Sequence, residues 1–276
     1  MSKHSSSANP ALERAILALR MARPDEAERL AERVLKSDRG NALAAQVLGR
    51  ALLMQDRAVE AIVPLERAAR RSDDPALETQ LAAAQAAAGR VDEALDRLRQ
   101  TTARRPPFSP AFLEYGGQLS RIGRLEEARA VLEEGLALTP DALDLQMELG
   151  FVHLKRNHRA LARALFLQVR ATAPERYDVL PALAKVMALD GEYAAAADLY
   201  RRALGLRPDD AMMRNNLGAC LLEMGQRDAG EASLRAVAGG APQSAGMAIT
   251  TLAAASHGRF FLRPSAAAKF LRVEKA

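Results

Sequence analysis

A large apolar residue followed directly by a small one recurs along the chain at a nearly constant interval. These pairs lie 34 residues apart, with one gap of 33, at Leu48–Gly49, Leu81–Ala82, Tyr115–Gly116, Leu149–Gly150, Leu183–Ala184 and Leu217–Gly218. Small residues form a second column with the same period, at Ala27, Ala61, Ala94, Ala128, Ala162, Ala196 and Gly230. Strong helix formers surround both columns, so the pattern predicts antiparallel helix pairs that approach closely at the small residues.

Residues that end helices repeat in the same register. Glycine or asparagine, which best tolerate the left-handed conformation of a helix C-terminus, separates the two helices of a pair at Gly89, Gly123, Asn157, Gly191 and Gly225. A proline closes each pair at Pro106, Pro140, Pro174, Pro208 and Pro242. Because proline disfavours helical conformation in the preceding residue, we expect the second helix of each pair to end before it.

The combined pattern resembles the tetratricopeptide repeat family, whose motif has a period of 34 residues, a large–small pair, an alanine and a closing proline. The resemblance implies an all-α, right-handed superhelical solenoid of antiparallel helix pairs, with about seven repeats and a C-terminal capping helix. We assign the repeats to residues 8–41, 42–74, 75–108, 109–142, 143–176, 177–210 and 211–244. Residues 1–7 are expected to form a disordered N-terminus, and residues 245–276 a capping helix and a basic–aromatic tail.

Three places depart from the regular pattern. Arg14 stands in the first repeat where a large apolar residue belongs, as is common in terminal repeats. Pro64 lies in the middle of a predicted helix and should bend that helix near Glu60. The proline-rich residues 104–110 resemble a linker, but the repeat spacing continues through them, so we expect continuous stacking.

The net charge does not alter the prediction of a helical repeat protein. The net charge is +5, but the 39 basic residues are mixed with 34 acidic ones along the chain, which is typical of a solvated surface. Cys220 is the only cysteine, so no intrachain disulfide can form. The polar N-terminus lacks the apolar segment of a signal peptide, and the sequence predicts a cytoplasmic protein.

Few residues are candidates for catalysis or for binding a metal or a cofactor. His153 and His158 are five residues apart across a predicted turn, so they lack the spacing of two ligands on one face of a zinc-binding helix. The glycines are explained by helix packing and helix ends, and Cys220 is interpreted as a small core residue. We therefore expect no catalytic residue, no metal site and no cofactor.

The resemblance implies instead that a partner protein or peptide binds in a concave groove lined by the first helix of each repeat. The corresponding positions in repeats four to seven are Leu113, Gly117, Arg121, Met147, Phe151, Leu154, Lys155, Lys185, Asn215 and Leu222. Met147, Phe151 and Leu154 would form an apolar stripe, which either anchors a partner or packs against neighbouring helices.

The C-terminal segment also has two interpretations. A helix is expected over residues 245–256 and another over residues 265–275, with Arg259, Phe260, Phe261 and Arg263 between them. This tail either folds back over the exposed end of the solenoid or docks a partner or a membrane surface.

The sequence therefore favours a non-catalytic adaptor that binds other proteins, with a resemblance to bacterial proteins of secretion and pilus assembly. The alternative is a basic protein that binds nucleic acid or a membrane surface through Arg104, Arg105 and the tail. A third possibility, an enzyme, would need catalytic groups that the sequence does not display. The oligomeric state cannot be inferred from these patterns.

Overall fold

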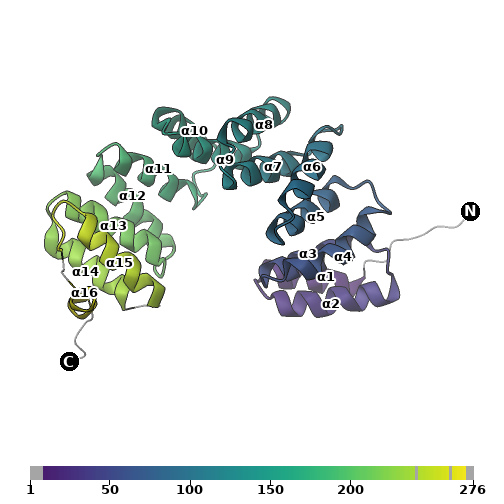
Figure 1. Ribbon diagram of the computed structural model, residues 1–276, viewed down its shortest axis with the longest axis horizontal. Helices are drawn as coiled ribbons and strands as arrows, with labels where there is room; N and C mark the ends of the chain where they lie inside the picture. The colour runs from purple at the N-terminus through teal and green to yellow at the C-terminus, as the bar shows by residue number, and fades with distance from the viewer. Residues whose placement is uncertain (1–8, 240–241, 261–262, 272–276) are drawn as a thin grey trace, which may run out of the picture. The chain divides into compact units, whose positions relative to one another are not determined.

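The computed structural model of the chain describes residues 9–239, 242–260 and 263–271, and within them every regular element is an α-helix (Figure 1). The expected disorder of residues 1–7, the side chain of Phe261 and the last residues of the expected 265–275 helix lie outside the described residues. The chain divides into two compact units, Met1–Glu148 and Leu149–Ala276. Each unit is described by itself.

The first unit holds α1 Pro10–Arg20, α2 Pro24–Ser37, α3 Ala42–Met54, α4 Ala58–Ala69, α5 Pro75–Ala87, α6 Val91–Thr102, α7 Ser109–Arg121 and α8 Leu125–Leu138. Helix α9, Leu143–Lys155, crosses the boundary between the units. The second unit continues with α10 Arg159–Thr172, α11 Val179–Leu189, α12 Tyr193–Leu206, α13 Ala211–Glu223, α14 Arg227–Ala238, α15 Pro242–Ala254 and α16 Pro264–Leu271. In the first unit each of these helices packs against the next, as α1 does against α2 and α2 against α3.

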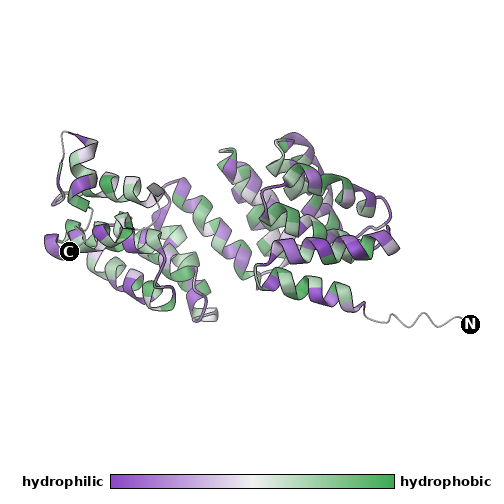
Figure 2. Ribbon diagram, turned by 90° about the horizontal axis from the view of Figure 1, so that it is seen from below, coloured by the Kyte–Doolittle hydropathy of each residue, from purple (hydrophilic) through white to green (hydrophobic). Residues whose placement is uncertain are grey.

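The two small-residue columns lie where paired helices approach each other. A Cβ atom on Gly116 of α7 would lie 2.5 Å from Leu132 of α8, and one on Gly49 of α3 would lie 2.7 Å from Leu65 of α4. Each glycine thus packs against a leucine that lies four residues after an alanine of the second column. These alanines, Ala61 and Ala128, are themselves fully buried. Hydrophobic and hydrophilic residues both appear along the helices in Figure 2, as amphipathic helices require.

The turn inside each pair adopts the left-handed conformation that the sequence predicts. Gly89 has φ +84° and Asn157 has φ 60°. In the first two pairs the equivalent residues are Ala22, with φ 53°, and Asp56, with φ 58°. Ala22 closes α1, since the N–H of Arg23 donates to the carbonyl of Ala18 at 2.9 Å.

Helix α4 continues through Pro64 from Ala58 to Ala69, so the proline does not end it. The bend near Glu60 stays a prediction. Residues 103–108 connect α6 to α7, and these two helices pack against each other inside the first unit.

The tail folds back onto the second unit. Helix α16 packs against α14 and α15, and Leu271 is 1% exposed within a cluster that includes Leu234 and Leu252. Between these helices Arg259 Nε donates to Glu231 Oε1 at 2.5 Å, and the Glu231 side chain is 3% exposed. A buried carboxylate needs such partners to offset the loss of water.

An aromatic ring joins α16 to the same arginines. The guanidinium carbons of Arg235 and Arg259 lie 4.6 and 4.7 Å from the centre of the Phe270 ring. Both distances are within the range of a favourable cation–π contact. The described part of the tail therefore covers the end of α14 and α15, as one of its two interpretations expects.

The left-handed turn residues allow a direct test of backbone strain. A left-handed residue costs an L-amino acid about 1–2 kcal/mol, whereas glycine adopts this conformation freely. Ala22→Gly should therefore raise the free energy of unfolding by about 0.5–1 kcal/mol, and Gly89→Ala should lower it by about 1 kcal/mol. Urea denaturation of the full chain measures both. A loss of stability in Ala22→Gly would contradict the assignment.

The contacts of Phe270 with Arg235 and Arg259 lead to a second prediction. Phe270→Ala removes the ring that Arg235 and Arg259 contact, so amide hydrogens of α16 should exchange roughly ten-fold faster. The matched control is Phe260→Ala, because Phe260 is 78% exposed and should leave this exchange unchanged. Hydrogen-exchange mass spectrometry of residues 264–271 measures the difference. Equal exchange in both variants would show that the ring does not hold the helix.

Candidate functional site

An apolar groove of about 510 Å³ runs along the odd-numbered helices of the first unit. Helices α1, α3, α5 and α7, with the residues just before α7, all contribute to it. Its apolar lining consists of Ile16, Leu19, Leu43, Val47, Leu53, Ala76, Ala83, Phe108 and Pro110. Its polar lining consists of Gln46, Arg50, Thr79, Gln80 and Glu114.

Hydrogen bonds between neighbouring odd-numbered helices fix the wall of this groove. Gln46 Nε2 donates to Asp74 Oδ2 at 2.8 Å, and Gln80 Nε2 donates to the backbone carbonyl of Gln46 at 2.7 Å. The other oxygen of Asp74 accepts from the N–H of Ala76 at 2.9 Å and so caps α5. The wall between α3 and α5 is therefore held in place without a ligand.

The groove offers apolar surface together with one uncompensated charge. Leu43 is 46% exposed at the start of α3. Arg50 is exposed, and within the described part of the chain no hydrogen bond or ion pair engages its guanidinium. Glu114, in contrast, accepts from Gln118 Nε2 at 2.6 Å. An incoming apolar side chain can lie on the aliphatic lining while a carboxylate pairs with Arg50.

The groove follows the same register that the family resemblance implies, but in different repeats. Its lining includes the second, fifth, ninth and twelfth residues of the repeat 42–74, which are Leu43, Gln46, Arg50 and Leu53. In the repeat 8–41 the ninth and twelfth residues are Ile16 and Leu19. The signal was therefore present in the sequence, and applying the register to the first three repeats would have found this groove.

Several residues expected to line a groove in the later repeats are buried. Met147 is 3% exposed, so the expectation of an exposed stripe is wrong at its first residue. Phe151 and Leu154 are half-buried, and the rings of Phe151 and Phe166 are 5.2 Å apart. Phe151 thus packs against the second helix of its own repeat, and the anchoring of a partner by Phe151 and Leu154 stays a prediction.

Asn215 and Leu222 are also covered, which corrects their expected place in an open groove. Leu222 is fully buried in the cluster formed with α14 and α15. Asn215 is 5% exposed, and its Nδ2 donates to Thr251 Oγ1 of α15 at 2.9 Å. Helix α15 packs against α13, so the positions that face open space in earlier repeats meet another helix here.

The remaining expected residues lie nearer the surface. Leu113 and Gly117 of α7 are half-buried, and Arg121, which is exposed, has a guanidinium nitrogen 4.0 Å from a Glu114 carboxylate oxygen. Lys155 and Lys185 are exposed, as are the tail residues Phe260 and Arg263. Their role in binding a partner stays a prediction.

The basic residues of the alternative hypothesis make contacts within the chain. Arg104 donates to the backbone carbonyl of Asp73 at 3.1 Å and lies 3.8 Å from Glu78. Arg105 donates to the carbonyls of Thr102, at 3.2 Å, and of Arg104, at 2.8 Å. Arg104 is thus engaged by a carbonyl and a carboxylate, whereas Arg105 bonds only backbone carbonyls through one nitrogen and stays exposed.

Other observations concern reactivity and membrane insertion. Cys220 is 2% exposed, and burial raises the pKa of its thiol to about 11, as expected of a core residue. Within the described residues, every helix is too short or too polar to cross a bilayer.

Comparisons with known proteins agree with this architecture. TPR repeat-containing protein PA4667 from Pseudomonas aeruginosa is 31% identical over 133 residues, which are 48% of this chain and 22% of that protein. A thermophilic TPR protein from Thermus thermophilus, TTC0263, is 25% identical with a TM-score of 0.57, over 64% of this chain and 97% of the other. The pilF structure from Pseudomonas aeruginosa is 16% identical with a TM-score of 0.56, over 72% and 91%.

The family models match nearly the whole helical array. One tetratricopeptide repeat model matches residues 12–76, 79–142 and 147–211, and a second matches residues 187–253. Repeats of this kind are scaffolds for protein–protein interaction. The helix pairs, their left-handed turns and these matches together show that the chain is an all-α solenoid belonging to the tetratricopeptide repeat family.

Proposed function

We propose that this protein is a non-catalytic adaptor that binds a peptide or helix of a partner protein in the groove of α1, α3, α5 and α7. The single observation that carries the proposal is the apolar lining that four successive odd-numbered helices supply to one groove. Seven repeats over residues 8–244 form the scaffold. An exposed apolar groove with a fixed wall is suited to partner binding, because apolar surface is buried without reorganising the protein.

The lining indicates the kind of segment that fits. Leu43, Val47 and Leu53 of α3 face the groove from three turns of one helix, and Phe108 adds an aromatic side chain. A partner segment with apolar side chains three or four residues apart would bury them along this row. A carboxylate on the same segment would pair with Arg50.

A role in assembling a bacterial secretion or pilus system, in the cytoplasm, is consistent with the likeness to pilF, which concerns the fold alone. Binding of nucleic acid or of a membrane through Arg104 and Arg105 is disfavoured because Arg104 is engaged by Asp73 and Glu78, which leaves Arg105 as a single exposed cation.

The groove is tested by adding a charge to its lining. Leu43→Glu should reduce partner binding at least about ten-fold, because a carboxylate would be buried against apolar side chains. Leu206→Glu is the matched control, since Leu206 is 61% exposed on α12, outside the groove.

Cross-linked capture from the source cell, followed by mass spectrometry, compares both variants with the unchanged protein. Circular dichroism confirms that each variant is folded. The proposal is wrong if Leu43→Glu retains the same partners as Leu206→Glu.

A further inference from the structure

Helix α4 has an unusual outward face. Val59 is 69% exposed and Val63 is 59% exposed. At the position of Val59 the other even-numbered helices from α2 to α14 carry Asp25, Asp92, Glu126, Ala160, Ala194 and Asp228. At the position of Val63 they carry Arg29, Asp96, Ala130, Ala164, Asp198 and Ala232. Valine forms helices less readily than alanine, and its exposure is unfavourable, so folding does not explain these two side chains.

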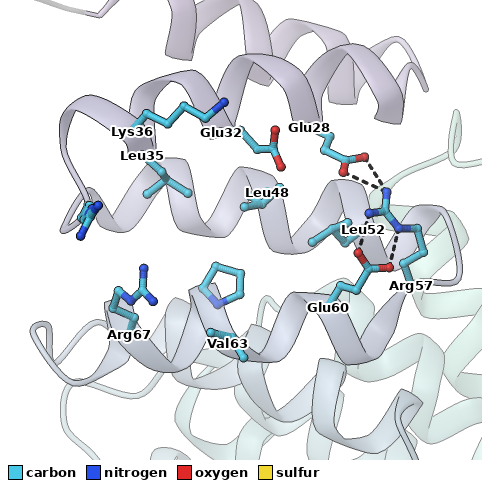
Figure 3. A pocket seen from close by; sticks show the side chains of 12 residues that line it. Glu28, Glu32, Leu35, Lys36, Leu48, Leu52, Arg57, Glu60, Val63 and Arg67 are labelled. Atoms are coloured by element: carbon cyan, nitrogen blue, oxygen red, sulfur yellow. Dashed lines mark hydrogen bonds and ion pairs between the residues drawn. The ribbon is translucent and has the colours of Figure 1, made fainter.

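An open groove of about 710 Å³ lies between α2 and α4, with Val63 in its lining (Figure 3). Leu48 and Leu52 of α3 form its floor, with Leu35 on the α2 side. Pro64 also lines it, at a position where α2, α8, α10 and α12 carry Leu or Val. The short proline ring fills less space than those side chains, and Leu48 and Leu52 beneath it are 7% and 3% exposed.

At one end of the groove a single guanidinium pairs with two carboxylates, which leaves one net negative charge there. Arg57 Nη1 donates to Glu28 Oε2 at 2.8 Å, and its Nε donates to Glu60 Oε1 at 2.7 Å. Gln55 Nε2 also donates to Glu28 at 2.8 Å. Figure 3 shows Arg57 joined to Glu28 and Glu60, so α2 and α4 are connected at this end.

The other end carries unpaired positive charge. Lys36, Arg39 and Arg67 are all exposed, and no described residue forms a hydrogen bond or ion pair with any of them. In Figure 3 Lys36 and Arg67 lie toward the end opposite Arg57. Glu32 is the one lining acid without a partner among the described residues, so three cations face one such carboxylate.

We propose that the groove between α2 and α4 is a second docking site, for an extended segment of a partner protein in which an apolar side chain is flanked by acidic ones. The apolar side chain lies on Val63 and Leu35, above Leu48 and Leu52, and the carboxylates pair with Lys36, Arg39 and Arg67. The charge complementarity selects this occupant over a basic or purely apolar segment. The site shares no lining residue with the groove of the odd-numbered helices and does not depend on the function proposed for that groove.

A peptide array tests the chemistry of the occupant. The probes are two pools of ten-residue peptides, each with a central Leu, Ile or Val, flanked in one pool by Asp and Glu and in the other by Lys and Arg. The full-length protein should bind members of the acidic pool with a Kd of roughly 1–100 µM and the basic pool at least about ten-fold more weakly. Equal binding to both pools, or none to the acidic pool, overturns the proposal.

Paired variants locate the binding. Arg67→Glu should weaken binding of the strongest acidic peptide about ten-fold or more. Arg202→Glu is the matched control, because Arg202 has the same repeat position in α12, is exposed, and makes the same charge change. Val63→Asp should also abolish binding, and Asp96 and Asp198 show that this repeat position accepts aspartate in folded helices. Equal effects of Arg67→Glu and Arg202→Glu would overturn the site.

Methyl NMR of the same complex separates this groove from the other. The peptide should shift the methyl signals of Val63 and Leu48 more than those of Leu43 and Val47. Shifts confined to Leu43 and Val47 would assign the peptide to the groove of the odd-numbered helices and overturn the second site. A dimer that Val63→Asp dissociates, measured by light scattering, would instead assign this face to a second copy of the chain.

Discussion

The close approach of two helices at a glycine or alanine is the contact on which the rest of the structure depends. Gly49 against Leu65 and Gly116 against Leu132 leave no room for a Cβ atom, so each pair forms one closely packed layer. A layer of two helices cannot bury all of its own apolar surface, and it must share that surface with the next layer. This arrangement leaves one side of the odd-numbered helices and one side of the even-numbered helices without a covering layer. Both grooves of the first unit lie on such sides.

The C-terminal end shows the effect of a covering element. Positions that are open on α3 are covered on α13 by α15, and α16 closes over α14 through Phe270 and the buried Glu231. The same repeat position therefore serves as core or as surface, depending on whether another helix packs over it. Leu53 and Leu222, both twelfth in their repeats, illustrate the difference, since Leu53 lines a groove and Leu222 is fully buried.

Much of the fold follows from local sequence signals. The turn residues and the columns of small residues are local signals that recur with a fixed period. They therefore predict the helix pairs and the left-handed turns. The site is less predictable because exposure depends on neighbouring layers. The register that the resemblance implies recurs in the lining of the groove of α1, α3, α5 and α7, whereas tertiary packing buries Met147, Asn215 and Leu222 at the same register. Val59 and Val63 can be recognised in the sequence, because the other even-numbered helices carry a charged residue or alanine at the same repeat positions. That Lys36 and Arg67 have no ion-pair partner among the described residues can be seen only in the structure.

Helix α3 lies between the two grooves and contributes to both. Leu43, Val47 and Leu53 face one groove, while Leu48 and Leu52 face the other. A ligand that shifts or stiffens this 13-residue helix from one side changes the surface available on its opposite side. Thermodynamic linkage makes any such effect reciprocal, so two partners on α3 would raise or lower each other's affinity by the same factor. The helix is thus placed to make an adaptor respond to whether its first partner is already bound.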